Sequence, residues 1–142
     1  MTLDDVFRAV KALWDLDPGL TATVPGGLWW EKPDQDAAYP QATMMAVEQP
    51  PEFTSGSAAI QQVDLDIMVR SNVGAVDSGG IQKRIRTLLG RDSRDDLQIP
   101  EVTKVLDVWP RTSAIKPDQL GKDARDVIVA TASFGVLLQI EV

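Results

Sequence analysis

The sequence predicts a single α+β domain, with a mainly antiparallel sheet of four to five strands and two helices packed on one face. The first observation is the central stretch, residues 60–90. Apolar and polar side chains alternate over residues 63–70, which is typical of a strand with one buried face. After a turn-forming segment, apolar side chains recur at helical spacing up to Leu89. A strand that leads into a helix over the same sheet begins a two-layer core, and the other apolar segments complete it.

The composition and the net charge argue against several classes of function. The 142 residues include no cysteine and no histidine, so thiolate chemistry, the commonest general base and the commonest metal ligand are all absent. We therefore predict a protein that is not an enzyme and holds no cofactor or metal. The net charge of −7 argues against binding of nucleic acid through a basic surface. The longest apolar runs fall well short of the roughly 20 residues that span a bilayer, which predicts no membrane association.

The N-terminal segment predicts the first of the two helices. Thr2 can cap this helix, and apolar side chains keep the i, i+3, i+4, i+7 spacing up to Leu16. Residues 18–40 are rich in proline and glycine, and we expect them to be irregular. The N-terminus lacks the basic region of a signal peptide, so we expect the protein to be made and kept in the cytoplasm.

Two adjacent tryptophans lie in the irregular segment. Because neighbouring side chains of an extended chain point to opposite faces, Trp29 and Trp30 cannot both point into the core. One is expected in the core and the other at the surface, where tryptophan is enriched at interfaces. Burial of both under the long loop is the alternative.

Further strands are predicted over Ala42–Glu48, Val102–Trp109 and the C-terminal segment from Ile128 to Val142. The last of these exceeds the usual length of a strand, so Gly135 predicts a bend or a bulge. The connecting segments, Glu52–Ala58 and the polar Pro110–Asp126, are too long for tight hairpin turns, and we expect both to be loops.

The helix after the central strand has polar features at both ends. Asp77 or Ser78 can cap its start, and no Gly-Lys-Ser/Thr follows that would indicate a phosphate-binding loop. Basic side chains gather at and after its C-terminus: Lys83, Arg84, Arg86, Arg91 and Arg94. A favourable interaction with the helix dipole explains them without a function. A charged contact between subunits is the alternative.

Two carboxylates, Asp64 and Asp66, lie on the polar face of the central strand. Paired carboxylates can hold a hard cation or act in acid–base catalysis. The same spacing also occurs on any half-exposed strand, so a solvated or channel-lining face is the other interpretation.

The order of elements and several local patterns resemble the phage tail-completion or tail-terminator family. The resemblance covers nearly the whole chain but depends on apolar patterns rather than on catalytic residues. It lies in these segments: the N-terminal helix Leu3–Leu16, the Tyr39-Pro40 step before a strand, the Thr54–Ser57 connector, the strand Val63–Val69, the helix Ile81–Leu89, and a polar segment before the final strand.

The resemblance implies a single tail-terminator-like domain over residues 1–142 and a structural role in the virion tail or neck, after assembly in the host cytoplasm. Such proteins form a six-membered ring on the tail-tube protein, stop tube growth and join the tail to the head connector. DNA would pass through the ring without specific binding, along a lumen lined by Asp64 and Asp66. A closed ring needs two different patches on each subunit. We expect the contact residues to be Trp29, Trp30, Phe53, Arg84, Arg86, Arg111, Lys116 and Lys122.

Two alternatives remain open at this point. Another neck or head–tail connector protein would have a similar size and would also form a ring. A small ligand-binding or enzymatic α+β domain, using Asp64 and Asp66, is a rival from a different class.

Overall fold

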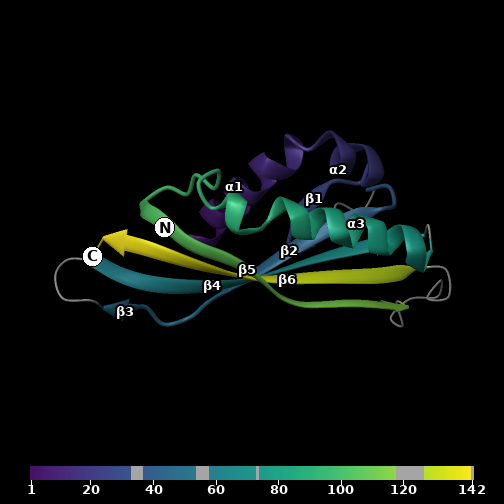
Figure 1. Ribbon diagram of the computed structural model, residues 1–142. Helices are drawn as coiled ribbons and strands as arrows, with labels where there is room; N and C mark the ends of the chain where they lie inside the picture. Colours follow the sequence, from purple (N-terminus) through teal and green to yellow (C-terminus); the bar gives the residue numbers. More distant parts are fainter. Residues whose placement is uncertain (33–36, 54–57, 73, 118–126, 142) are drawn as a thin grey trace.

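The structure is a computed structural model that describes residues 1–32, 37–53, 58–72, 74–117 and 127–141. Its long sheet has the strand order β1-β2-β4-β6-β5, and a short β3 also pairs with β4 (Figure 1). The described pairs are antiparallel except for β1 with β2. The strands are β1 Leu28–Trp30, β2 Gln41–Glu48, β3 Glu52–Phe53, β4 Ala58–Ser71, β5 Val102–Pro117 and β6 Ile128–Glu141. The helices are α1 Leu3–Asp15, α2 Pro18–Thr23, α3 Ala75–Leu88 and the 3₁₀ turn η1 Arg91–Ser93.

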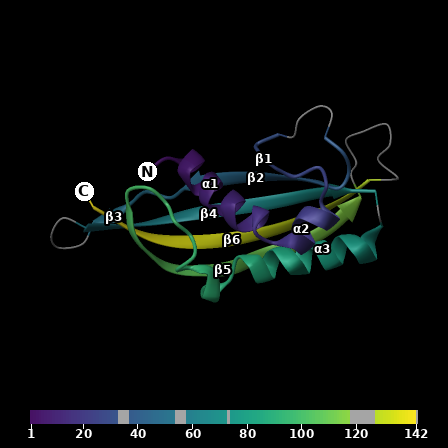
Figure 2. The ribbon, with the colours of Figure 1, turned by 90° about the horizontal axis from the view of Figure 1, so that it is seen from above.

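The helices lie on one face of the sheet, with α1 near β1 and β2 and α3 along β5 and β6 (Figures 1 and 2). The predicted α+β class and the mainly antiparallel sheet are therefore confirmed. The sheet has one more strand than the upper predicted number, and α2 is a third helix where an irregular segment was expected. The sequence does contain a helix-start signal for α2, because Asp17 is a residue that caps helices and Pro18 suits the first turn. In the structure Oδ1 of Asp17 accepts hydrogen bonds from the amides of Gly19 and Leu20.

The core lies between the sheet and the helices, and β4 shows how the sequence specifies it. Every second side chain of β4 is buried, as the alternation predicts. These side chains meet apolar residues of β6 and of the two long helices. The main members are Val63, Leu65, Ile67, Val69, Phe134, Val136, Leu138, Val6, Val10, Trp14, Ile81 and Ile85.

The predicted start of α3 is wrong. The helix begins at Ala75, and its N-cap is Gly74, which has φ +90° and makes no side-chain capping bond. A positive φ of this size is a conformation that favours glycine. Ser78, one of the two predicted caps, is instead fully buried inside the helix.

The predicted loop from Pro110 is also wrong over its first eight residues, because β5 continues to Pro117. A register shift between Pro110 and Ser113 accommodates Arg111 and Thr112, and pairing with β6 then resumes. Proline is tolerated there because β5 is an edge strand. The rest of the predicted loop, residues 118–126, lies outside the described residues.

A glutamine of α3 fastens the helix to this extension of β5. Nε2 of Gln82 donates to the carbonyl oxygens of Ala114, at 3.1 Å, and Thr131, at 2.7 Å. These two residues are opposite each other in the β5–β6 pair. The amide therefore joins both strands to the helix that covers them.

Gly135 has a different role from the predicted bulge. The register of β6 with β4 is continuous through Gly135, and the irregularities lie between β5 and β6 on either side of it. A Cβ at position 135 would lie 2.3 Å from the indole of Trp109. The glycine therefore lets this indole lie directly against the strand.

Candidate functional site

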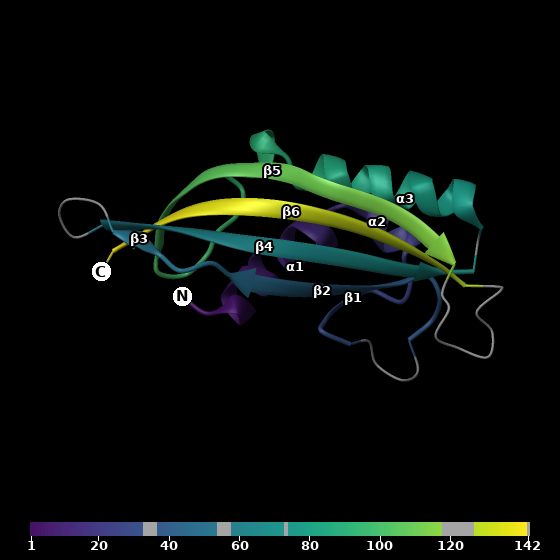
Figure 3. The same ribbon diagram turned by 90° about the horizontal axis from the view of Figure 1, so that it is seen from below.

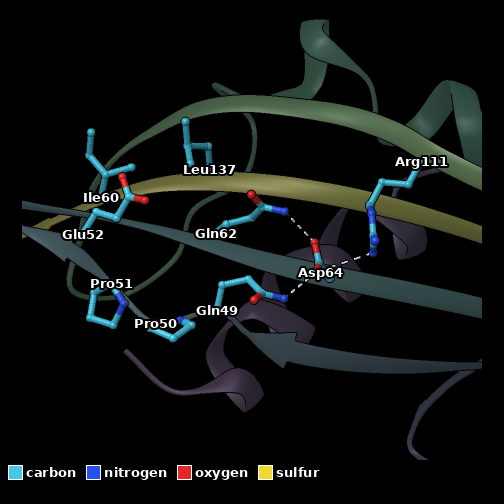
Figure 4. A pocket seen from close by; sticks show the side chains of 9 residues that line it. All are labelled: Gln49, Pro50, Pro51, Glu52, Ile60, Gln62, Asp64, Arg111 and Leu137. Atoms are coloured by element: carbon cyan, nitrogen blue, oxygen red, sulfur yellow. Dashed lines mark hydrogen bonds and ion pairs between the residues drawn. The ribbon is translucent and has the colours of Figure 1, made fainter.

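The face of the sheet opposite the helices has no helix over it among the described elements (Figure 3). We call it the open face. A groove of about 670 Å³ lies on it, between the segment that follows β2 and the strand β5 (Figure 4). Its lining residues are Gln49, Pro50, Pro51, Glu52, Ile60, Gln62, Asp64, Arg111 and Leu137.

Asp64 is the best-anchored polar side chain in this groove. Its carboxylate accepts hydrogen bonds from Nε2 of Gln49 and Nε2 of Gln62, both at 2.9 Å, and lies 3.5 Å from Nη1 of Arg111 (Figure 4). Only 15% of its side chain is exposed. Two amide donors and a guanidinium thus hold the carboxylate in place and offset its charge.

Asp66 lies two residues along the same face but is exposed. It is opposite Met45 on β2 and Ser133 on β6, and its carboxylate accepts a hydrogen bond from the Ser133 hydroxyl. The alternation of β4 also places Arg70 on this face. The two predicted carboxylates therefore share the open face with cations, so the face has both signs of charge.

An apolar strip lies along the β2 edge of the open face. Met45 and Val47 are 52% and 59% exposed, and Trp29 on β1 is 36% exposed. Strand β1 pairs only with Ala42–Met44, so the rest of β2 has no described strand on its outer side. An exposed apolar strip beside an unpaired strand edge is typical of an interaction surface.

The two tryptophans separate as the alternation requires. Trp30 packs against the core, with its ring 5.6 Å from that of Phe7. Trp29 lies on the other side, and its indole Nε1 donates to the Gly26 carbonyl oxygen at 2.6 Å. Of the two, Trp29 is the one available to a partner.

Arg84, a predicted contact residue, is used within the chain. Its Nε and Nη2 lie 2.9 and 2.7 Å from Oδ1 of Asp17, so it joins α3 to the N-cap of α2. Burial by itself would raise the pKa of the Asp17 carboxyl. The hydrogen bonds from Arg84 and from the amides of Leu20 and Gly19 outweigh burial, so this pKa lies below its ordinary value.

The other predicted contact residues are spread over the molecule. Arg86 is exposed on α3, and Lys116 is exposed on β5 rather than in a loop. Phe53 lies in β3, where its backbone pairs with Ala59. Lys122 lies outside the described residues.

Sequence reasoning predicted Trp29 but missed Gln49, Gln62 and the other two members of the apolar strip, Met45 and Val47. Gln62 was within reach of prediction, because it lies two residues before Asp64 on the same strand face. The adjacent apolar residues Met44 and Met45 likewise require one exposed side chain. The approach of Gln49 and Arg111 to Asp64 depends on strand register, for which the sequence has no local signal.

Within the described ranges, no three histidine, cysteine or acidic side chains come close enough together to hold a metal ion. No described helix is both long and apolar enough to cross a membrane.

Comparison with known proteins gives a likeness of fold. No protein-family model and no curated protein matches this chain. A chain in the solved structure of the virion of a native gene transfer agent particle superimposes with a TM-score of 0.69 at 15% sequence identity, covering 93% of this chain and 92% of that chain. A second solved structure gives a TM-score of 0.53 at 16% identity, covering 97% and 96% of the two chains. The near-complete coverage indicates that nearly the whole chain, with its long sheet and one-sided helices, shares its fold with that chain of the particle.

Proposed function

We propose that this chain is a structural protein of a phage-like virion, and that it caps the tail tube as a ring, ends tube growth and joins the tail to the head connector. The observation that supports this most is the match over nearly the full length to a chain from a gene transfer agent virion. The resemblance of the sequence to tail terminators supports the finer assignment. In this proposal residues 1–142 form one ring subunit, and six subunits close the ring.

The two edges of the sheet fit such a ring. A closed ring requires a heterologous interface, in which one patch of a subunit meets a different patch of its neighbour. The apolar strip of Trp29, Met45 and Val47 on the β2 edge supplies one patch of the kind that partners cover. The β5 edge and α3 lie at the opposite side of the sheet. These edges support further copies of this chain as partners. The tail-tube protein and the head–tail connector are the partners that the resemblance to tail terminators implies.

The open face is the surface we assign to the lumen. Asp64 and Asp66 lie on it, and the first is offset by Arg111. A face with both signs of charge would let DNA pass without strong attraction, because binding to the phosphate backbone depends on an excess of positive charge. Reversing both carboxylates to lysine should slow or block DNA delivery by assembled particles. Unchanged assembly and delivery would count against a lumen position for this face.

Deleting the gene for this chain and measuring tail length by electron microscopy of the particles that still form tests its role at the tail end. A terminator predicts tubes that exceed the normal length and do not join heads, with both defects repaired by the wild-type chain. Tubes of normal length without heads would instead indicate another neck or head–tail connector protein. Normal particles would contradict both roles.

The groove at Asp64 leaves a small-ligand role as the remaining rival, and a thermal melt tests it. A ligand present at 100 times its dissociation constant adds about 2.7 kcal/mol to the stability of the folded state. We expect no such shift with magnesium. A shift that Asp64→Asn abolishes would favour the ligand-binding role.

A further inference from the structure

Charge is distributed unequally between the two flanks of the sheet. Among the described residues, the segment from 1 to 53 contains seven acidic and three basic side chains, whereas the segment 75–117 contains six acidic and eight basic ones. The first segment forms α1, α2, β1, β2 and the short β3, and the second forms α3 and β5 at the opposite edge (Figure 2). One edge of the domain is thus acidic and the other basic.

On the basic flank, the exposed side of α3 forms a groove of about 400 Å³ lined by Asp17, Gly80, Lys83, Arg84 and Thr87. Lys83 is exposed and has no ion pair with any described side chain. Gly80 leaves the groove open, because no atom lies within 4 Å of where its Cβ would be. The groove therefore offers an ammonium group, and part of the Arg84 guanidinium, to an incoming anion.

On the acidic flank, some carboxylates form ion pairs within the chain and others do not. Asp4 and Asp15 form ion pairs with Arg8 and Lys11 within α1. Two exposed glutamates at the sheet edge, Glu31 directly after β1 and Glu48 at the end of β2, have no ion pair with a described cation. Glu48 accepts a hydrogen bond at 3.3 Å from Nε2 of Gln61, a neutral donor, so no described cation offsets its charge. The exposed Glu52 also has no ion pair with a described cation, but it pairs with Ile60 of β4 and does not lie on the β1–β2 edge. Glu31 and Glu48 are thus the carboxylates that this edge offers to a neighbour.

We propose that the α3 groove of one copy receives the carboxylates of the β1–β2 edge, Glu31 and Glu48, from a second copy of this chain. The proposal rests on the proposed ring, in which opposite edges of neighbouring subunits meet. Complementary charge speeds the encounter and fixes the register of two protein surfaces. A second copy is the occupant we favour, because its own β1–β2 edge supplies exposed carboxylates that no described cation offsets. The net charge of −7 opposes the approach of DNA and of a second copy alike, so the contact depends on these local charges.

Charge reversal tests this contact by sedimentation velocity in low salt. Lys83→Glu combined with Arg86→Glu, one turn apart on α3, leaves Arg84 and its ion pair intact. This variant, and the variant Glu31→Lys with Glu48→Lys, should each need on the order of tenfold more protein for half-maximal self-association. An equimolar mixture of the two should assemble as readily as the wild type, because unlike copies can alternate around an even-numbered ring. Arg94→Glu with Lys104→Glu is the control with the same change in net charge, and it should assemble normally.

Three results would overturn the contact. These are unchanged assembly of the α3 variant, failure of the mixture to recover, and a wild-type chain that stays monomeric in low salt at all concentrations. Loss of duplex DNA binding by the α3 variant, with normal self-association, would assign the groove to phosphate instead. The terminator role is judged separately by tail length, so a normal ring from the α3 variant would overturn only this contact.

Discussion

The two faces of β4 differ in burial: one set of side chains packs under the helices, and the other set lies on the open face. Val63, Leu65, Ile67 and Val69 are fully buried under the helices. Their neighbours on the open face include Gln62, two aspartates, Met68 and Arg70, which are exposed or half-buried. Burial therefore selects apolar side chains over the middle of the covered face, whereas Gln61 and Ser71 toward its two ends are buried polar residues. The open face is free to vary, and its groove, its apolar strip and its charges are the features that point to partners.

Substitutions on the two faces of β4 should differ most in their effect on the free energy of unfolding. Leu65→Ala on the covered face should lower the free energy of unfolding by about 3 kcal/mol, because it leaves a cavity in the core. Val47→Ala on the open face is the matched control, and it should change stability by less than about 0.5 kcal/mol. Urea denaturation measures both. Equal losses would mean that the open face is also buried in the folded protein.

A second change tests the close approach on the open face. Gly135→Ala should cost about 2 kcal/mol, because the new methyl group would collide with the Trp109 indole. Trp109→Ala should remove most of that additional cost in the double variant. Gly79→Ala in α3 is the control: its Cβ would be 3.5 Å from Ile115, an ordinary contact, and the change should stabilise the helix by about 0.5–1 kcal/mol. Independent effects of the substitutions at positions 135 and 109 would refute the collision.

A smaller effect concerns the helical layer that covers the sheet. Asp17→Ala should cost about 1 kcal/mol at pH 7, because the N-cap of α2 and the ion pair with Arg84 are both lost. Since the folded pKa of Asp17 is lowered, this stabilisation is fully present above the ordinary carboxyl pKa of about 4 and is lost as pH falls through the folded value. The gap in unfolding free energy between the wild type and Asp17→Ala should therefore be larger at neutral pH than at acid pH. Asp17→Asn, which keeps the capping oxygen, should lie between them at pH 7, and a gap independent of pH would contradict the ion pair.

Replacing Trp29 should change the free energy of unfolding least, and it should weaken assembly of the ring more than folding of the monomer. Trp29→Ala should cost less than about 1 kcal/mol, chiefly the hydrogen bond to Gly26, and it should weaken the ring. Trp30→Ala should destabilise the monomer more, because it removes the packing against Phe7. Thermal melts and native mass spectrometry distinguish these outcomes. If both changes unfold the protein, the apolar strip belongs to the fold and not to an interface.

The covered face was predictable because burial imposes a period on the sequence. The buried set of β4 and the buried stripe of α1 follow from spacing alone. The helix α2 was missed because its proline and glycine were interpreted as loop residues, although Asp17-Pro18 is a helix-start signal. The C-terminal part of β5 lacks the alternation of apolar and polar side chains that would predict a strand. It is a strand because it pairs with β6, and Gln82 of α3 donates a hydrogen bond to it.

The site was less predictable than the fold because it depends on register. The sequence places Asp64 and Asp66 on one face of a strand, and the structure agrees. It contains no local signal that Arg111, 47 positions along the chain, approaches the same carboxylate. Which cations remain free on α3 likewise depends on the pairing of Arg84 with Asp17.

Native mass spectrometry of the purified wild-type chain, over a range of concentrations and with and without magnesium, measures whether this chain closes into a ring of six subunits. A ring subunit should give a hexamer in both conditions, formed more readily in low salt and in the presence of tail-tube subunits. A stable dimer would contradict the ring, because two copies in a self-complementary contact cannot build a closing ring on a tube end.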